Sequence, residues 1–296
     1  MAVQRKGIMG ALRDLGGALL PLSVRDLQRE IDDRIRKVPT RLNEYGYDLF
    51  GMSPSSARQS ILQSALLYRH YFRVETFGIE RVPSGRVLLI SNHAGQLPFD
   101  GMMLGTAMVL EAEPPRIARA MGEYWIPRIP FFNVVATRAG NLVGTPENCE
   151  ALLEAGELVM VFPEGVRGMN KPFTERYQLQ RFGLGFMRLA LETDTPIVPV
   201  GIVGSEEQQP GIANLPQLGR LLGMPSFPIT LGFPWLGPLG MLPLPVRYRI
   251  HFGEPMHFAG SSSDEDATIQ DQVDHVKAEI SGLLAHGRET RRGIFT

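Results

Sequence analysis

The sequence predicts an α/β fold, with a mixed, largely parallel sheet flanked by helices and an N-terminal helical extension. Short apolar runs at 86–91, 157–162 and 197–203 are typical of buried strands. A chain of 296 residues that is 44% apolar can bury a full α/β core plus a smaller helical element. We expect three parts, which are an N-terminal helical extension (1–75), an α/β domain (76–260) and a C-terminal amphipathic helix with its tail (261–296).

In the extension, Ser53 and Pro54 are a typical helix start, and apolar residues continue at helical spacing as far as Phe72. The next elements expected in chain order are a strand at 86–91, a helix near 101–111, a strand at 117–121 and a strand at 134–137.

The following helix has the clearest ends, because Thr145 can cap it, Pro146 suits its first turn and Gly156 suits its end. The remaining elements are a strand at 157–162, a helix at 182–192, a strand at 197–203, an alternating strand typical of a sheet edge at 246–252, and a C-terminal helix over 269–284.

Composition excludes several classes of protein. The net charge is −1 and the pI about 6.6, which does not fit a nucleic-acid-binding surface. Cys149 is the only cysteine, so no intrachain disulfide can form, and its place in a predicted helix indicates packing. The six histidines lack metal-ligand spacing and no nucleotide-type phosphate loop is present, so we expect no metal and no cofactor.

Two short polar segments follow predicted strands, at 91–100 (SNHAGQLPFD) and 161–168 (VFPEGVRG). The first contains a base, His93, and a carboxylate, Asp100, that can orient it. The second contains Gly165, which permits a tight turn, and Arg167, which can bind an anion. Ligands of α/β folds collect where strands end, so both segments are expected at one site.

Together these segments resemble the glycerolipid acyltransferases with a histidine–aspartate motif, which include the lysophosphatidate and glycerol-3-phosphate acyltransferases. The resemblance spans roughly residues 69–205. Its second block is similar to PFFNVVATR at 130–138, ending in Arg138, and its fourth is similar to TPIVPVG at 195–201. Four matches in the same order are a much stronger signal than the histidine and aspartate alone.

The resemblance implies that His93 is the general base and that Asp100 orients it. The family usually places four residues between the two, whereas six intervene here. Asp100 has a second interpretation, as N-cap of the helix that begins at Gly101, and Gln96 is the alternative partner for the histidine. Ser91 is expected to be structural, because a thioester is already activated and needs no covalent acyl-enzyme.

The resemblance also implies that Arg138 and Arg167 bind the phosphate of an acceptor, with Glu164 and Gly165 shaping the turn. Glu164 can position an arginine or accept a hydrogen bond from an acceptor hydroxyl. The alternative is a surface pair between Glu164 and Arg167, of little energetic value. Lys171 is expected to be solvated, and the arginines that can extend the basic rim are Arg116, Arg119 and Arg128.

The implied function is an O-acyltransferase that moves a fatty acyl group from acyl-CoA or acyl carrier protein to a glycerolipid hydroxyl. Because two arginines suggest a phosphate, 1-acylglycerol 3-phosphate is the preferred acceptor. The sequence EGVR in the second segment and the longer loop between His93 and Asp100 leave open a relative of the monoacylglycerol and diacylglycerol acyltransferases, with a neutral acceptor. A non-catalytic lipid-binding protein and a hydrolase remain as further alternatives.

Lipid substrates imply a membrane surface, yet residues 1–20 lack a signal-peptide pattern and six prolines interrupt the longest uncharged run, 224–246. We therefore expect a cytoplasmic protein that is peripheral on the cytoplasmic face of the membrane. Candidate contacts are the N-terminal third and the apolar segment 227–246, followed by Arg247 and Arg249. The first candidate includes leucines within 12–20 and the stripe at 61–72, which alternatively packs on the domain.

Overall fold

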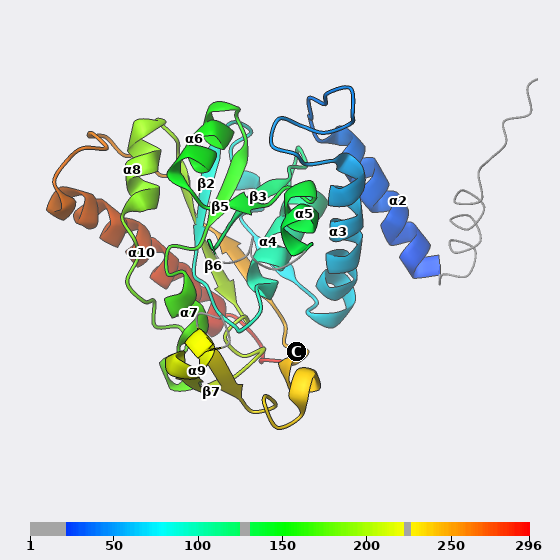
Figure 1. The fold of residues 1–296 in the computed structure, drawn as a ribbon, viewed down its shortest axis with the longest axis vertical. Coiled ribbons are helices and arrows are strands. Elements are labelled where there is room, and N and C mark those ends of the chain that lie inside the picture. Colours follow the sequence, from blue (N-terminus) through cyan, green and yellow to red (C-terminus); the bar gives the residue numbers. More distant parts are fainter. Residues whose placement is uncertain (1–21, 125–130, 222–225) are drawn as a thin grey trace, which may run out of the picture.

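The protein, described here from a computed structural model, is placed over residues 22–124, 131–221 and 226–296. Its main sheet has seven strands in the order β1-β9-β6-β2-β5-β3-β4 (Figure 1). Neighbouring strands run parallel except for the antiparallel pair β6–β9. The strands are β1 Glu75–Phe77, β2 Val87–Ser91, β3 Ala118–Gly122, β4 Leu142–Val143, β5 Leu158–Val161, β6 Ile197–Val203 and β9 Arg249–Phe252. The expected mixed, largely parallel sheet is confirmed.

Helices cover both faces of this sheet (Figure 1). The helices of the described residues are α2 Leu22–Lys37, α3 Pro54–Leu66, α4 Phe99–Leu110, α5 Phe132–Arg138, α6 Pro146–Glu154, α7 Val166–Asn170, α8 Gly185–Glu192, α9 Pro216–Leu221 and α10 Asp266–Glu289. A π-helical turn, Leu67–Tyr71, continues α3, and 3-10 turns lie at Ile79–Arg81, Phe173–Glu175 and Gly237–Met241.

The alternation of side chains along β2 explains why both faces need a cover. Val87 and Leu89 pack in a core with residues of α2, α3 and α4, whereas Leu88 and Ile90 pack in a second core with residues of α6, α8 and α10. Every residue of β2 is buried, as expected for a central strand of a parallel sheet. Two hydrophobic layers therefore hold this strand, and the loop that follows it starts from a rigid point.

Two of the expected strands differ from the structure. Residues 134–137 lie in helix α5, and Val134 and Val135 are exposed. The preference of β-branched residues for strands depends on packing against a half-buried sheet, and here the short strand β4 occupies the edge beside β3. The alternating strand expected at the sheet edge is β9, which lies between β6 and β1 and is buried along its length.

Local signals were more reliable at α6. Its first residue is Pro146, the hydroxyl of Thr145 accepts a hydrogen bond from the Asn148 N–H, and Gly156 follows its end with φ of 80°. Cys149 is buried on this helix, and burial raises its pKa to about 11, in keeping with packing. In the described residues, no helix combines the length and the apolar character that a membrane span requires.

The apolar stripe near 61–72 packs on the α/β domain, as the second interpretation predicted. Ala65, Tyr68 and Phe72 are fully buried in the core. Arginines of this region bond within the protein, since Arg58 pairs with Asp32 and Arg69 pairs with two carboxylates. The leucines between 12 and 20 lie outside the described residues, and the division into three parts stays a prediction.

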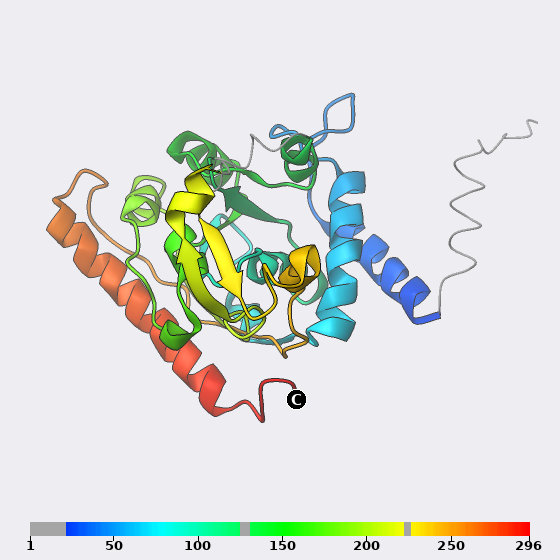
Figure 2. The same cartoon turned by 60° about the horizontal axis from the view of Figure 1, so that its bottom comes forward.

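Between β6 and β9 the chain leaves the main sheet and forms a small unit of its own. Its antiparallel strands, β7 Gly211–Leu215 and β8 Phe227–Thr230, form a two-stranded sheet. This pair, α9 and the 3-10 turn at 237–241 come forward together in Figure 2. In Figure 1 they lie at the same end of the molecule as α7.

Candidate active site

The site lies at the carboxyl ends of the neighbouring strands β2 and β5. The chain leaves β2 toward α4, on one face of the sheet, and leaves β5 toward α7 and α8, with α8 on the other face. Connections that diverge in this way leave a crevice between two parallel strands, where α/β folds bind ligands. The segments that follow β2 and β5 contain His93 and Glu164.

His93 and Asp100 are in direct contact, and the loop of six intervening residues does not prevent it. His93 Nδ1 lies 2.7 Å from Asp100 Oδ2, and both side chains are buried. The imidazole keeps 11% of its side-chain surface exposed, and its Nε2 has no hydrogen-bond partner among the described residues. One ring nitrogen is therefore fixed by a carboxylate, and the other is free for a substrate.

Asp100 is held by the start of α4, although not as its N-cap. The helix begins at Phe99, so Asp100 is its second residue, and Pro98 occupies the cap position without a side-chain bond. Asp100 Oδ2 also accepts from the Ala94 N–H at 2.9 Å, and Oδ1 accepts from the Gly101 N–H at 2.7 Å. Three donors therefore hold one fully buried carboxylate in a fixed position beside the imidazole.

The electrostatics of His93 combine opposing effects. Burial alone lowers its pKa, but the charge and hydrogen bond of Asp100, with smaller contributions from Glu164 and Glu123, raise the pKa above its ordinary value of 6.5. The ring of Phe162 lies 4.5 Å from the imidazole, at an angle of 30°. This packing and the bond to Asp100 limit the orientations of the imidazole.

Glu164 joins the two segments. Its Oε1 accepts from the His93 backbone N–H at 2.9 Å, and its Oε2 accepts from the Gln180 N–H at 2.7 Å. The surface pair with Arg167 is therefore wrong, because Glu164 is buried while Arg167 is exposed. Glu164 connects the segment after β5 to the backbone of the base.

Two glycines allow this close approach. Gly165 has φ of 55° and ψ of −145°, a conformation that suits glycine. A Cβ on Gly168 would lie 2.6 Å from the carbonyl oxygen of His93 and 2.9 Å from Glu164 Cβ. Glycine at 168 therefore lets α7 pack directly on the histidine loop, which sequence reasoning did not predict.

Lys171 is buried rather than solvated. Its Nζ lies 2.7 Å from Glu206 Oε1 and 3.8 Å from Glu164 Oε2. Burial raises the pKa of Glu206 to about 7, against the lowering effect of Lys171 and with a smaller raising effect from Glu164. A buried cation between two carboxylates supports the turn that contains Glu164.

The arginines proposed for the acceptor have different surroundings. Arg167 is exposed on α7, next to Gly168, and has no ion-pair partner in the described parts of the chain. Arg138 is also exposed, but its guanidinium stacks over the ring of Tyr47, 5.3 Å from the centroid. No described interaction joins Arg138 to the histidine segment, and its role stays a prediction.

The basic rim proposed from Arg116 and Arg119 is wrong. Arg119 is 1% exposed and pairs with Asp48 and Glu157. Arg116 donates to the carbonyl oxygens of Pro83 and Gly156. Both are structural residues, because their donors bond to protein groups. Arg128 lies outside the described residues.

Other polar residues of the first segment have structural partners. Asn92 bonds through its amide to both backbone groups of Ile202, which joins the end of β2 to β6. Gln96 donates to the Met169 carbonyl, so it does not replace Asp100. Ser91 is fully buried with only local bonds, as a structural residue would be.

Gln209 accepts from the backbone N–H groups of Gln96 and Leu97 and was missed by sequence reasoning. The only available signal was the polar run SEEQQ at 205–209, directly after an apolar strand. Such a run, in which every residue is buried, is a candidate for a side-chain network. Gln96 and Leu97 lie more than 100 residues before Gln209 in the sequence, so only the fold identifies them as its partners.

A sequence model of the family described as Acyltransferase matches residues 73–203, which include His93, Asp100, Glu164 and Arg167. An uncharacterized protein of Mycobacterium tuberculosis is 40% identical over 259 residues, covering 85% of this chain and 72% of that protein. The chain belongs to the acyltransferase family. Membership implies an acyl donor and a lipid acceptor for the crevice described above.

Two further comparisons place this acyltransferase. A mouse protein described as a DGAT1/2-independent enzyme synthesizing storage lipids is 23% identical, over 71% of this chain and 59% of that protein. The crystal structure of the 1-acyl-sn-glycerophosphate (LPA) acyltransferase PlsC from Thermotoga maritima matches with a TM-score of 0.52 and 16% identity. The match covers 80% of this chain and 81% of that one, and it shows the shared fold.

Proposed function

We propose that this acyltransferase moves a fatty acyl group from acyl-CoA or acyl carrier protein to the free hydroxyl of 1-acylglycerol 3-phosphate. His93 is the general base of the reaction. The observation that carries the proposal is the 2.7 Å contact between His93 Nδ1 and Asp100, which leaves Nε2 free to take a proton. The raised pKa of His93 fits a base that must hold this proton during the reaction.

In the proposed step, the acceptor oxygen attacks the thioester carbonyl while His93 Nε2 removes the hydroxyl proton. Asp100 stabilises the imidazolium that forms. The tetrahedral intermediate then collapses, the C–S bond breaks, and the proton passes from His93 to the departing thiolate. A thioester is already activated, so the proposal includes neither a covalent acyl-enzyme nor a cofactor.

Arg167 is the proposed phosphate-binding residue. Its guanidinium is exposed and has no partner among the described residues, and it lies on α7, the helix that packs against the histidine loop. A guanidinium binds phosphate oxygens with two parallel hydrogen bonds, which fits a dianionic head group. Lys171 is less suitable for this role, because its charge is already buried against Glu206 and Glu164.

A neutral acceptor is the second candidate. The observation that favours it is the position of Arg138, whose guanidinium stacks on the ring of Tyr47. Arg167 on α7 is then the arginine that remains beside the histidine loop, and a neutral acceptor has little need for both arginines. Monoacylglycerol or diacylglycerol would then be the acceptor, in line with the storage-lipid enzyme among the relatives. A lipid-binding protein without catalysis is a third candidate, which would bind lipid equally well without His93.

The test is transfer of a labelled palmitoyl group from palmitoyl-CoA, and separately from palmitoyl acyl carrier protein, to a panel of acceptors. The panel contains lysophosphatidate, glycerol 3-phosphate, lysophosphatidylcholine and monoacylglycerol. We expect transfer to lysophosphatidate, lowered by a factor on the order of 10² or more in a folded His93→Ala variant. Preference for monoacylglycerol would favour the second candidate, and near-normal turnover of His93→Ala would exclude this base.

A further inference from the structure

The unit between β6 and β9, residues 208–246, has an unusual composition. Arg220 is its one charged residue, whereas 21% of the whole chain is charged. We call its described part, 208–221 and 226–246, the wedge. Many of its large apolar side chains are exposed: Ile212, Leu215, Leu218, Leu221, Leu231, Trp235, Leu236, Leu239, Leu242 and Leu244. A cluster of this size is rare on a monomeric soluble protein unless it meets a partner.

The wedge is an ordered structure and not an open loop. Strands β7 and β8 pair with each other from the pair Gly211 and Thr230 to the pair Leu215 and Phe227, and the Leu244 N–H donates to the Gln208 carbonyl at 2.7 Å. Near its tip, a Cβ on Gly232 would lie 2.9 Å from the Cα of Gly240, so the two backbone segments touch. Trp235 and Leu239 are nevertheless 70% and 71% exposed. A folded backbone therefore presents these side chains to the outside.

The wedge is joined directly to the active site. Gln209, at its base, accepts from the backbone N–H groups of Gln96 and Leu97 in the histidine loop. Asn214 on β7 donates to the Asn170 carbonyl at the end of α7. In Figure 1 the wedge lies at the same end of the molecule as α7. A surface in contact with the wedge would therefore lie beside the crevice that contains His93.

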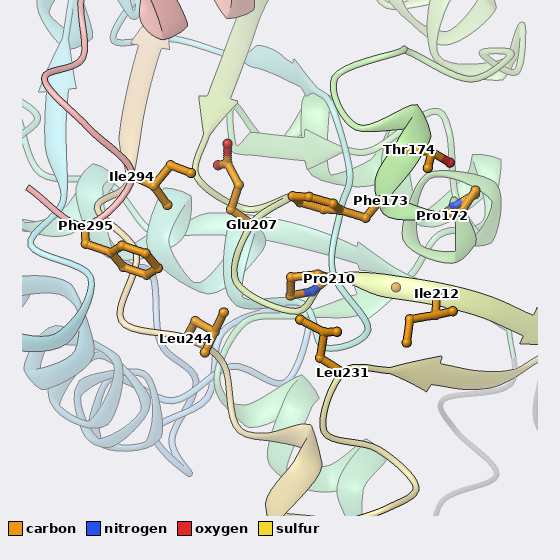
Figure 3. A pocket seen from close by; sticks show the side chains of 11 residues that line it. Pro172, Phe173, Thr174, Glu207, Pro210, Ile212, Leu231, Leu244, Ile294 and Phe295 are labelled. Carbon is orange, nitrogen blue, oxygen red and sulfur yellow. The ribbon is translucent and has the colours of Figure 1, made fainter.

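An apolar hollow of about 460 Å³ opens on the wedge (Figure 3). Its lining includes Ile212, Leu231 and Leu244, which also belong to the exposed cluster, together with Phe173 and Phe295. A fluid hydrocarbon layer can fill such an irregular surface, whereas a folded partner must match its shape. The hollow thus favours lipid as the occupant.

We propose that the wedge is a docking surface for an anionic lipid bilayer. Protein interfaces combine an apolar centre with a polar rim and roughly one hydrogen bond per 100–200 Å². The wedge has few groups for such a rim, and its one charge, Arg220, is exposed without a partner in the described residues. Together with Arg167, it can meet anionic head groups as the apolar side chains enter the interface.

With the wedge in the bilayer, the crevice that contains His93 would lie beside the membrane surface, where a lipid acceptor is available to the base. Trp235 suits the interface, because its ring is apolar and its N–H is polar. Arg247 and Arg249, expected to meet lipid heads, bond within the protein instead: Arg247 to Glu75, and Arg249 to the Gly287 carbonyl and Thr290. The docking surface is therefore the wedge itself, and the arginines that follow it are structural.

The first test measures binding of the full chain to vesicles of phosphatidylcholine with phosphatidylglycerol. We expect Trp235→Glu/Leu239→Glu to lower the partition coefficient at least 10-fold, because two carboxylates would enter the interface. Tyr45→Glu/Leu49→Glu is the matched control, since both residues are highly exposed in a loop at the opposite end of the molecule (Figure 1). Circular dichroism checks the fold of each variant.

Trp235 also reports its own surroundings, because Trp125 is the only other tryptophan. In a Trp125→Phe variant, its emission should shift to the blue when phosphatidylglycerol vesicles are added. Unchanged emission, or equal vesicle binding by the two double variants, would overturn the proposal. A dimer that the wedge variant converts to a monomer, without any effect on vesicle binding, would assign the surface to a second copy of the chain.

The docking proposal and the proposed reaction can fail separately. With a short-chain lysophosphatidate dissolved in water, the wedge variant should keep wild-type turnover, while its turnover of a vesicle-borne acceptor falls. If the wedge variant kept wild-type turnover of both the soluble and the vesicle-borne acceptor, docking would be excluded and the reaction would stand. Vesicle binding without transfer to any acceptor would exclude the reaction and leave docking intact.

Discussion

Replacing Asp100 with asparagine tests the proposed mechanism most directly, because the change preserves size and removes one charge. The wild-type carboxylate accepts three hydrogen bonds, from His93 Nδ1, the Ala94 N–H and the Gly101 N–H. An amide has one oxygen, so it cannot satisfy donors on both sides of the group. The result depends on which way the amide points.

If the amide oxygen takes the place of Oδ2, the bonds to His93 and Ala94 remain and the Gly101 N–H loses its acceptor. The free energy of unfolding should then fall by about 1–3 kcal/mol. The hydrogen bond from the imidazolium no longer reaches a charged group, which removes about 1.5–3 kcal/mol of transition-state stabilisation, or roughly 10- to 10²-fold in rate. If the amide nitrogen faces His93 instead, the imidazole must adopt the other tautomer and the loss is on the order of 10⁴.

The pH dependence separates this role from a purely structural one. A general base must be neutral, so kcat/KM falls as the pH drops below the raised pKa of His93. Without the charge of Asp100, burial dominates and lowers the pKa of His93, so the acidic limb should move to lower pH while the plateau falls. The assay is kcat/KM with a water-soluble acceptor between about pH 5 and 9, with thermal unfolding as the fold control. An unmoved limb, or a plateau within about twofold of wild type, would refute the reasoning.

Three further predictions concern the surroundings of the base. Arg167→Ala should raise KM for lysophosphatidate on the order of 10-fold or more and leave monoacylglycerol unaffected, while Arg29→Ala, an exposed arginine on α2, should change neither. Equal effects of the two variants in acceptor kinetics would argue against Arg167 as the phosphate-binding residue. Gly168→Ala should push α7 away from the His93 carbonyl, lower the free energy of unfolding by about 1–3 kcal/mol in chemical denaturation and reduce turnover. Its control is Gly282→Ala, in open space on α10, which should raise the free energy of unfolding by about 0.5–1 kcal/mol, and a silent Gly168→Ala would contradict the close packing. Glu206 binds its proton more tightly in the folded protein, because its pKa is about 7 there against an ordinary value of 4.5, so the free energy of unfolding should decrease as the pH rises between these values. In measurements of unfolding against pH, Glu206→Gln should flatten that part of the curve.

The elements that the sequence predicted well are those whose signals are local. Helix α6 is an example, because Thr145 and Pro146 satisfy or remove the free N–H groups of its own first turn. Strand β6 follows the predicted bounds, since a run of apolar residues suits only a position buried on both faces. His93 and Asp100 also lie in one short segment, so their contact depends mainly on a loop and the first turn of α4.

The failures arise where distant segments decide the outcome. Val134 and Val135 have strand propensity, yet they are exposed in helix α5, and among the described residues the strand that pairs with β3 at this edge of the sheet is β4. Lys171 looked solvated because its counter-charge, Glu206, arrives from the far end of β6. The polar network around Gln209 was invisible for the same reason.

By itself, the sequence determined the α/β class, the order of most elements and the segments that contain the proposed base and its carboxylate. Hydrophobic periodicity and helix caps specify these features within a few residues of each other. Only the tertiary structure decided that Glu164 accepts from the backbone of His93, that Arg138 stacks on Tyr47, and that the apolar wedge stands beside the crevice. Those contacts follow from which strands become neighbours, and neighbouring strands are set by the burial of the whole core rather than by any local pattern.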